Sequence, residues 1–219
     1  MYLSPAQRRV RRASHLWRAL TLLAALALTI SIDRTLWTWL RLDAAATLPS
    51  KDWWQALRAL GYLPLWLVVG ALFILRDHAT RFAGGGLAAW HRGTMVVLGA
   101  ACSGLIAEIA KAIIRRQRPG DDGALRFDWA GQGLQGLGIG TVSSHAAVAF
   151  GGAFMLGLLV PAWRWPLFLL ALACAWSRVA AGAHFVSDCF AAALVSYAVV
   201  RLLRRALAEF PGAPESLSA

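Results

Sequence analysis

The sequence is poor in charged residues, and this scarcity bounds the class of protein. Asp, Glu, Lys and Arg make up only 15% of the 219 residues, whereas an ordinary soluble domain carries roughly 25%. Hydrophobic residues account for 58% of the chain, and the mean hydropathy is +0.56. This composition argues against a water-soluble protein. It favours one compact helical bundle surrounded by membrane lipids.

Acidic residues and cysteines are scarcer still. The chain has 11 Asp and Glu against 22 Lys and Arg, which gives a net charge of +11. Such an excess could indicate a nucleic-acid-binding protein, but the basic residues cluster at the ends of apolar runs, where membrane topology requires them. We therefore predict no nucleic-acid partner. The three cysteines, Cys102, Cys174 and Cys189, lie within apolar runs at spacings that match no metal site, and we interpret them as small buried hydrophobic residues.

Long apolar runs define the expected fold. Runs of about 20 residues can cross the hydrocarbon core as helices. We predict an all-α integral membrane bundle of six transmembrane helices, with the ranges 16–32, 57–75, 93–114, 145–160, 165–180 and 184–203. The segment 35–42 is expected to be an interfacial helix or part of a long first helix. A single domain is expected over residues 1–210, followed by a disordered tail at 211–219.

The positions of the arginines predict the orientation. Both termini are expected in the cytoplasm, because the basic head and the arginines after the second, fourth and sixth runs then lie inside. The outer loops keep Arg34, Arg41, Lys51 and Arg58, balanced in part by Asp33, Asp43 and Asp52. No small-residue cleavage site follows the first run, so we expect it to remain as a helix in a bacterial-type inner (cytoplasmic) membrane.

Three polar clusters interrupt the apolar runs, and the predicted topology places all of them on the outer face. Charge at a membrane segment is expensive and usually serves chemistry. The first cluster contains Lys111 and Arg118, which are seven residues apart and would share a helix face ending near Pro119. Arginine can bind a phosphate in a bidentate manner, and lysine supplies a point charge. Arg115 and Arg116 could instead be simple headgroup anchors.

The second cluster, Ser143-Ser144-His145, opens the fourth predicted helix. Either serine can cap the helix, and the free backbone N–H groups at a helix start suit an anion. His145 would then lie beside that anion, where it could protonate a leaving oxygen. A plain serine cap followed by an interfacial histidine is the alternative interpretation.

The third cluster is the most specific. It contains Ser177-Arg178, and further on His184 and Asp188, which are four residues apart and would face the same way on a helix. A carboxylate one turn away can accept the Nδ1 proton of His184 and leave Nε2 free as a nucleophile. A buried structural His–Asp pair is the alternative.

Taken in order, the three clusters resemble the signature of the type 2 phosphatidic acid phosphatase superfamily. The first and third clusters match that pattern fully. The second departs from it, because Val142 and Ser144 stand where the family usually has proline and glycine. The backbone N–H of Ser144 remains available, so we interpret the change as tuning. The resemblance covers residues 111–188, and the layout of six spans extends it to most of the chain.

The resemblance implies an integral membrane lipid phosphatase with its active site at the outer (periplasmic or extracellular) face. His184 would become a phosphohistidine, Asp188 would orient it, and His145 would protonate the departing oxygen and then activate water. The phosphoryl oxygens would be held by Lys111, Arg118, Ser143, Ser144 and Arg178. The substrate would be a lipid phosphomonoester or pyrophosphate, such as undecaprenyl pyrophosphate, phosphatidylglycerophosphate, phosphatidic acid or a lipid A phosphate.

No metal and no other cofactor is expected. The loop acids Asp121, Asp122 and Asp128 are interpreted as solvated. Glu108 lies about one turn before Lys111, and we predict that it neutralises and positions that lysine. Two other functions stay open. Vanadium haloperoxidases share the motifs but are soluble, and a non-catalytic membrane anion-binding protein or transporter would lack turnover.

Overall fold

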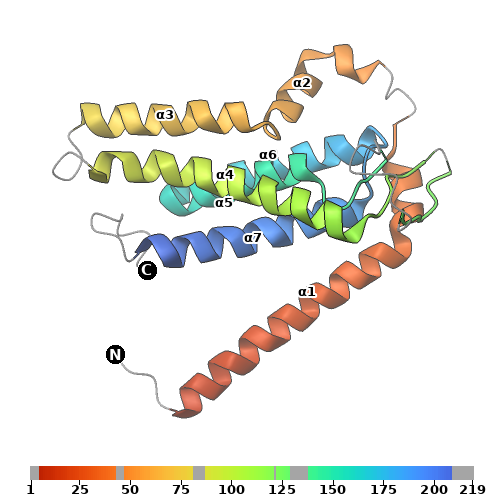
Figure 1. Ribbon diagram of the computed structural model, residues 1–219, viewed down its shortest axis with the longest axis horizontal. Coiled ribbons are helices and arrows are strands. Elements are labelled where there is room, and N and C mark those ends of the chain that lie inside the picture. The colour runs from red at the N-terminus through yellow and green to blue at the C-terminus, as the bar shows by residue number, and fades with distance from the viewer. Residues whose placement is uncertain (1–4, 43–46, 81–86, 121, 129–137, 209–219) are drawn as a thin grey trace.

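The computed structural model describes residues 5–42, 47–80, 87–120, 122–128 and 138–208 (Figure 1). Every regular element in these ranges is a helix, which confirms the all-α prediction. The α-helices are α1 (Pro5–Leu40), α2 (Asp52–Ala59), α3 (Leu63–Ala79), α4 (Leu87–Ile114), α5 (Ser144–Leu159), α6 (Arg164–Ala180) and α7 (Val186–Ala208). Short 3-10 helices lie at Leu48–Ser50 (η2) and Pro161–Trp163 (η4). The tail 211–219 lies outside the described residues.

Several helices are long and apolar enough to cross a membrane. Within the described residues these are three segments, Leu16–Leu40, His91–Ile114 and Val186–Ala206, or four if the bent pair α2–α3 counts as one crossing. The chain is therefore a multi-pass membrane protein by length and composition. α5 has 16 residues and α6 has 17, fewer than the roughly 20 that a full crossing needs. The number of six crossings stays a prediction.

The second predicted helix is the clearest error in the sequence-based boundaries. Residues 57–75 do not form one helix, because α2 ends at Ala59, α3 begins at Leu63, and the two are bent by 69°. Pro64 lies at the start of α3, where its missing N–H and fixed φ are tolerated. The segment 35–42 continues α1 as far as Leu40, which confirms the second of its two predicted roles, that it is part of a long first helix.

Helix α5 is the centre of the molecule. Most of its side chains are buried, and many are alanine or glycine. Such small residues let neighbouring helices approach closely in a membrane protein. A Cβ on Gly151 would lie 2.2 Å from the carbonyl oxygen of Gly99 in α4, so only glycine fits there. Cys174 and Cys189 are buried and Cys102 is half-buried, in agreement with their interpretation as hydrophobic packing residues.

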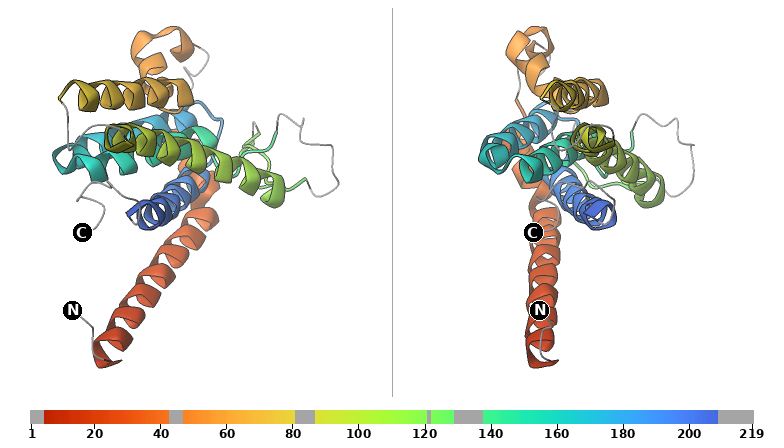
Figure 2. Two further views of the ribbon diagram at one scale, coloured as in Figure 1. Left: turned by 60° about the vertical axis from the view of Figure 1, so that its left-hand side comes forward. Right: turned by 90° about the vertical axis from the view of Figure 1, so that its left-hand side faces the viewer.

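Helix α1 diverges from the other helices over most of its length (Figures 1 and 2). It contacts α6 and α7 near its C-terminal end, where the backbone N–H of Leu42 donates to the carbonyl oxygen of Ala180 at 3.0 Å. Many large apolar side chains of its N-terminal part are exposed, among them Leu16, Trp17 and Leu28. The firm attachment of α1 to the bundle is therefore at the end where α6 stops and α7 starts.

Candidate active site

The helix ends that carry the polar clusters lie together at one end of the molecule. The end of α4, the start of α5, the end of α6 and the start of α7 meet there, whereas the start of α1 and the end of α7 lie at the opposite end (Figure 1). The sequence predicted that all three clusters lie on one face of the membrane, and this arrangement agrees with that prediction. The clusters are close enough to form one site.

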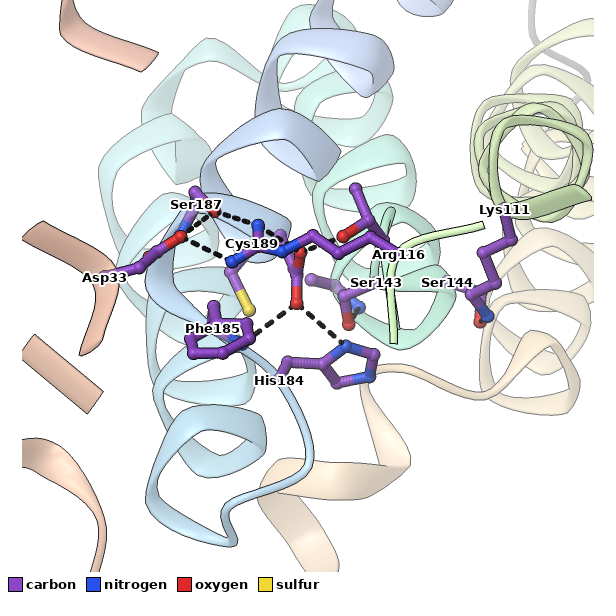
Figure 3. Close-up of polar contacts among 12 residues, drawn as sticks. Asp33, Lys111, Arg116, Ser143, Ser144, His184, Phe185, Ser187 and Cys189 are labelled. Atoms are coloured by element: carbon purple, nitrogen blue, oxygen red, sulfur yellow. Dashed lines mark hydrogen bonds and ion pairs between the residues drawn. The ribbon is translucent and has the colours of Figure 1, made fainter. Parts of the chain in front are cut away.

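Lys111 connects the first cluster to the second. Its Nζ donates a hydrogen bond of 2.7 Å to the Ser144 hydroxyl; both residues are labelled in Figure 3. The same Nζ lies 2.8 Å from Oε1 of Glu108. The predicted contact between Glu108 and Lys111 is therefore present. Ser144, which replaces the usual glycine, is the first residue of α5, and a helical backbone suits any residue there. Its hydroxyl gives Lys111 a second partner, so this departure from the family pattern contributes to the site.

We expect Glu108→Gln to lower kcat/KM by about two- to fivefold, because the Glu108 side chain is 58% exposed and an exposed ion pair contributes little. The measurement is the initial rate of phosphate release, together with the thermal stability of the variant in detergent. Wild-type activity combined with wild-type stability would show that Glu108 does not position Lys111.

The segment after α4 follows a different course from the predicted one. Lys111 and Arg118 do not share a helix face, because α4 ends at Ile114 and Arg115 has a φ of 53°. Arg118 instead belongs to an extended segment, which folds back on the following loop. Two isolated bridges hold this segment, Arg116 with Phe127 and Gln117 with Ile139.

Ser143 caps helix α5 as the sequence indicated. Its Oγ accepts a hydrogen bond of 3.5 Å from the backbone N–H of Ala146, and its own N–H donates to the carbonyl oxygen of Asp188 at 3.3 Å. His145 follows on the first turn, and its Nε2 is buried without a hydrogen-bond partner. A helix start with free N–H groups and an unpartnered imidazole nitrogen can receive an anion.

His184 and Asp188 are close, but they are not on one helix face. The predicted start of the last helix at 184 is wrong, because α7 begins at Val186. Asp188 Oδ2 accepts a hydrogen bond of 2.9 Å from the backbone N–H of Phe185. An acidic side chain in the first turn of a helix often accepts the N–H of the residue that caps the helix in this way. Nδ1 of His184 is 3.7 Å from that same oxygen and has no hydrogen-bond partner. The predicted hydrogen bond is therefore replaced by a longer electrostatic contact.

Arg116 is the most important residue that sequence reasoning missed. A headgroup anchor, which is one of the roles that the sequence allows for it, would face lipid or water, yet Arg116 is only 3% exposed. Its guanidinium forms ion pairs with Asp33 at 2.8 Å and with Asp188 at 3.2 Å, and it donates to the Ser187 hydroxyl at 2.7 Å. It also lies 4.2 Å from the ring centre of Phe185. Figure 3 shows this group on the α7 side of His184.

Asp33 completes this buried group from α1. The sequence placed it among the acids of the outer loops, but it is fully buried. Its Oδ1 accepts the backbone N–H of Ser187 at 3.0 Å, and its Oδ2 accepts the Ser187 hydroxyl. Oδ1 of Asp188 also accepts the hydroxyl of Thr141. The Asp188 carboxylate is thus held by contacts with Arg116, Thr141 and the backbone of Phe185.

Three arginines, Arg58, Arg118 and Arg178, lie near the two histidines. Arg118 and Arg178 both act electrostatically on His184, and Arg58 and Arg118 both act on Arg178. None of the three forms an ion pair with any residue that the structure describes. Nε of Arg58 and Nε of Arg178 are buried without a partner. Arg178 is buried, Arg58 is half-buried and Arg118 is exposed. The unused buried donors of Arg58 and Arg178 are costly, and a bound anion would relieve that cost.

The environment of His184 favours its neutral form. Burial lowers the pKa of His184 below its usual value, and the charges of Arg178 and Arg118 act in the same direction. Asp188 acts in the opposite direction without reversing the shift. A neutral imidazole is the nucleophilic form, so the position suits nucleophilic attack near neutral pH.

The loop acids are partly engaged by arginines. Asp122 Oδ2 is 2.5 Å from Arg126, and Asp128 Oδ2 is 3.8 Å from Arg115, while Asp121 lies outside the described residues. In the described ranges no group of three or more His, Cys, Asp or Glu side chains could hold a metal ion. A reaction without a metal remains a prediction.

Comparisons with known proteins agree with the geometry. A sequence model of the PAP2 superfamily matches residues 92–210, a range that contains all three clusters. No curated protein matches the chain in sequence. The crystal structure of a transmembrane PAP2-type phosphatidylglycerolphosphate phosphatase from Bacillus subtilis has a similar fold, with a TM-score of 0.59 and 19% identity over 92% of this chain and 98% of that one. The chain belongs to the PAP2 superfamily.

Proposed function

We propose that this protein is a membrane lipid phosphatase that hydrolyses a phosphomonoester or a pyrophosphate carried by a lipid. The observation that carries the proposal is the pair of buried Nε–H donors without partners on Arg178 and Arg58, beside His184 and His145. Arginine N–H groups match the oxygens of a phosphoryl group in charge and geometry. Family membership and the fold shared with a phosphatidylglycerolphosphate phosphatase support the same class of reaction.

The first step forms a phosphohistidine. Nε2 of His184 attacks phosphorus, the bond from phosphorus to the lipid oxygen breaks, and its electron pair stays on that oxygen. His145 donates a proton to the departing oxygen. Asp188 is 3.7 Å from the imidazole, so its charge stabilises the imidazolium that forms.

The second step releases phosphate. His145, now neutral, takes a proton from water, and the water oxygen attacks the phosphorus of the phosphohistidine. The P–N bond breaks and His184 returns to its neutral form. In both steps Lys111, Arg118 and Arg178 hold the phosphoryl oxygens, assisted by the hydroxyl of Ser143 and the backbone N–H of Ser144.

The apolar chain of the substrate has a suitable place beside these groups. A cavity of about 370 Å³ lies between α1, α6 and α7 and is lined almost wholly by apolar atoms. Its lining includes Leu40, Val186 and Cys189, and Cys189 directly follows Asp188 in α7. A hydrocarbon chain in this cavity would stay in the bilayer while its phosphate reaches His184.

The experiment that tests this function is phosphate release by the purified full chain in detergent. The substrates are phosphatidic acid, phosphatidylglycerophosphate, undecaprenyl pyrophosphate and a lipid A phosphate, each with EDTA present. We expect release from at least one of them. Binding of inorganic phosphate without any turnover would favour a non-catalytic anion-binding protein or transporter, and activity lost with EDTA would contradict a metal-independent reaction.

We further propose a cytoplasmic membrane location with both termini inside and the active site outside. The arginine-rich ends of the apolar runs support this orientation. In a variant without native cysteines, Leu125→Cys, on an exposed part of the loop after α4, is expected to react with a membrane-impermeant thiol reagent in intact cells or spheroplasts. Reaction only after the cells are lysed would reverse the orientation.

A further inference from the structure

The turn between α2 and α3 packs directly on His145, although it lies outside the range that the family model matches. A Cβ on Gly61 would lie 2.8 Å from Cβ of His145, so only glycine allows this approach. The ring of Tyr62 meets the ring of His145 edge-on, with centroids 4.7 Å apart. This turn is therefore part of the wall of the site on the side of His145.

Arg58 enters the site from the same segment. Its guanidinium donates to the hydroxyl of Tyr62 at 3.2 Å, while its Nε is buried and has no partner. Its charge acts on both His145 and Arg178. Helix α2 is held in place by Trp54, which is 1% exposed and packs edge-on against Trp176 of α6. Arg58 is thus a fixed cation with an unused donor, next to the histidine assigned to the departing oxygen.

We propose that Arg58 binds an anionic leaving group, which makes lipid diphosphates the substrate class that this site serves best. The inference rests on the proposed phosphatase function and assigns a substrate preference to it. Lys111, Arg118 and Arg178 already neutralise the phosphoryl group that is transferred. Arg58 is a fourth cation, and it lies on the side of His145. The second phosphate of a diphosphate would lie on that same side.

The chemistry of the two leaving groups explains why a cation matters there. When a monoester is cleaved, the lipid leaves as an alcohol, which needs the proton of His145. When a diphosphate is cleaved, the bond from the terminal phosphorus to the bridging oxygen breaks, and the electron pair stays on a lipid monophosphate. That product is a stable anion whose second pKa is about 6. The negative charge that develops on the lipid monophosphate as it leaves is therefore stabilised more by a nearby fixed cation than by a proton donor.

The test compares a diphosphate and a monophosphate on the same lipid chain. Geranylgeranyl diphosphate and geranylgeranyl monophosphate are assayed as initial rates, and the lipid product is identified by chromatography so that sequential cleavage is recognised. In Arg58→Gln we expect the ratio of kcat/KM for the diphosphate to kcat/KM for the monophosphate to fall by at least about tenfold. Arg58→Lys, which keeps the charge, is expected to recover part of the ratio.

Arg126→Gln is the matched control, because it removes the same charge from an exposed, paired arginine of the loop after α4. We expect it to keep the wild-type ratio. An Arg58→Gln variant that is folded in detergent but has an unchanged ratio would overturn the inference, whether both rates fall equally or neither falls. A wild-type protein that is inactive on both prenyl lipids but active on another lipid phosphate would also overturn the inference, whereas inactivity on every lipid tested would refute the proposed function.

Discussion

Replacement of His184 by alanine is expected to lower kcat by roughly 10⁴-fold or more, because the variant lacks the atom that we propose attacks phosphorus. Lys111, Arg118 and Arg178 remain in this variant, so substrate can still bind. The measurement is phosphate release at saturating lipid substrate. His91→Ala is the matched control, since His91 lies at the opposite end of α4, and it is expected to retain wild-type activity.

A covalent label separates a nucleophile from a histidine that only supports the fold. Substrate labelled in its phosphoryl group is mixed with enzyme and quenched in alkali, in which a phosphohistidine is stable. We expect label on the wild type, and more of it on His145→Ala, because the second step slows when the base is missing. Label that persists on His184→Ala would assign the nucleophile to another residue.

The pH dependence provides an independent check on His184. In the proposed mechanism the imidazole attacks only when it is neutral, so activity should be present above the pKa of His184 and lost below it. Because burial lowers this pKa from its usual value of about 6.5, the acid limb of kcat/KM is expected below about pH 6.5. The ionisation of the substrate near pH 6 is measured separately. An acid limb above pH 7 would contradict a neutral, buried nucleophile.

The sequence predicted the parts of the site that depend on local order. An apolar run indicates a helix, and a polar cluster at its end indicates a helix terminus, so Lys111, His145 and His184 could be assigned to one end of a bundle before their contacts were known. The local error at His184 is also informative. Spacing of four residues implies a shared helix face only inside a helix, and this histidine precedes α7.

The contacts that hold the site together were not predictable in this way. Asp33 and Arg116 are 83 residues apart, and neither residue shows in its own surroundings that the other is its partner. The position of Arg58 near His145 was not predictable either, because it depends on the bend between α2 and α3. Hydropathy averages across such a bend and indicates one continuous helix. Long-range pairing of charges and departures from helix geometry therefore required the structure.

Replacement of Arg116 by methionine is expected to impair both the fold and the reaction. The variant leaves Asp33 and Asp188 as buried carboxylates without their shared cation, and removal of one partner from a buried ion pair costs about 3–5 kcal/mol. The melting temperature in detergent should therefore fall clearly. We expect kcat to fall by roughly 10²- to 10³-fold with a much smaller change in KM, because Asp188 loses a contact that fixes it beside His184.

A second variant distinguishes positioning from a purely structural role. Asp33→Asn combined with Arg116→Met removes one of the two uncompensated carboxylates, so the melting temperature should recover in part. If Arg116 positions Asp188, kcat stays low in the double variant even though stability returns, because Asp188 still lacks its cation. Recovery of kcat in parallel with the melting temperature would show that Arg116 only stabilises the junction between α1 and α7. Asp33→Asn alone keeps the contact of Arg116 with Asp188 and is expected to retain much more activity than Arg116→Met.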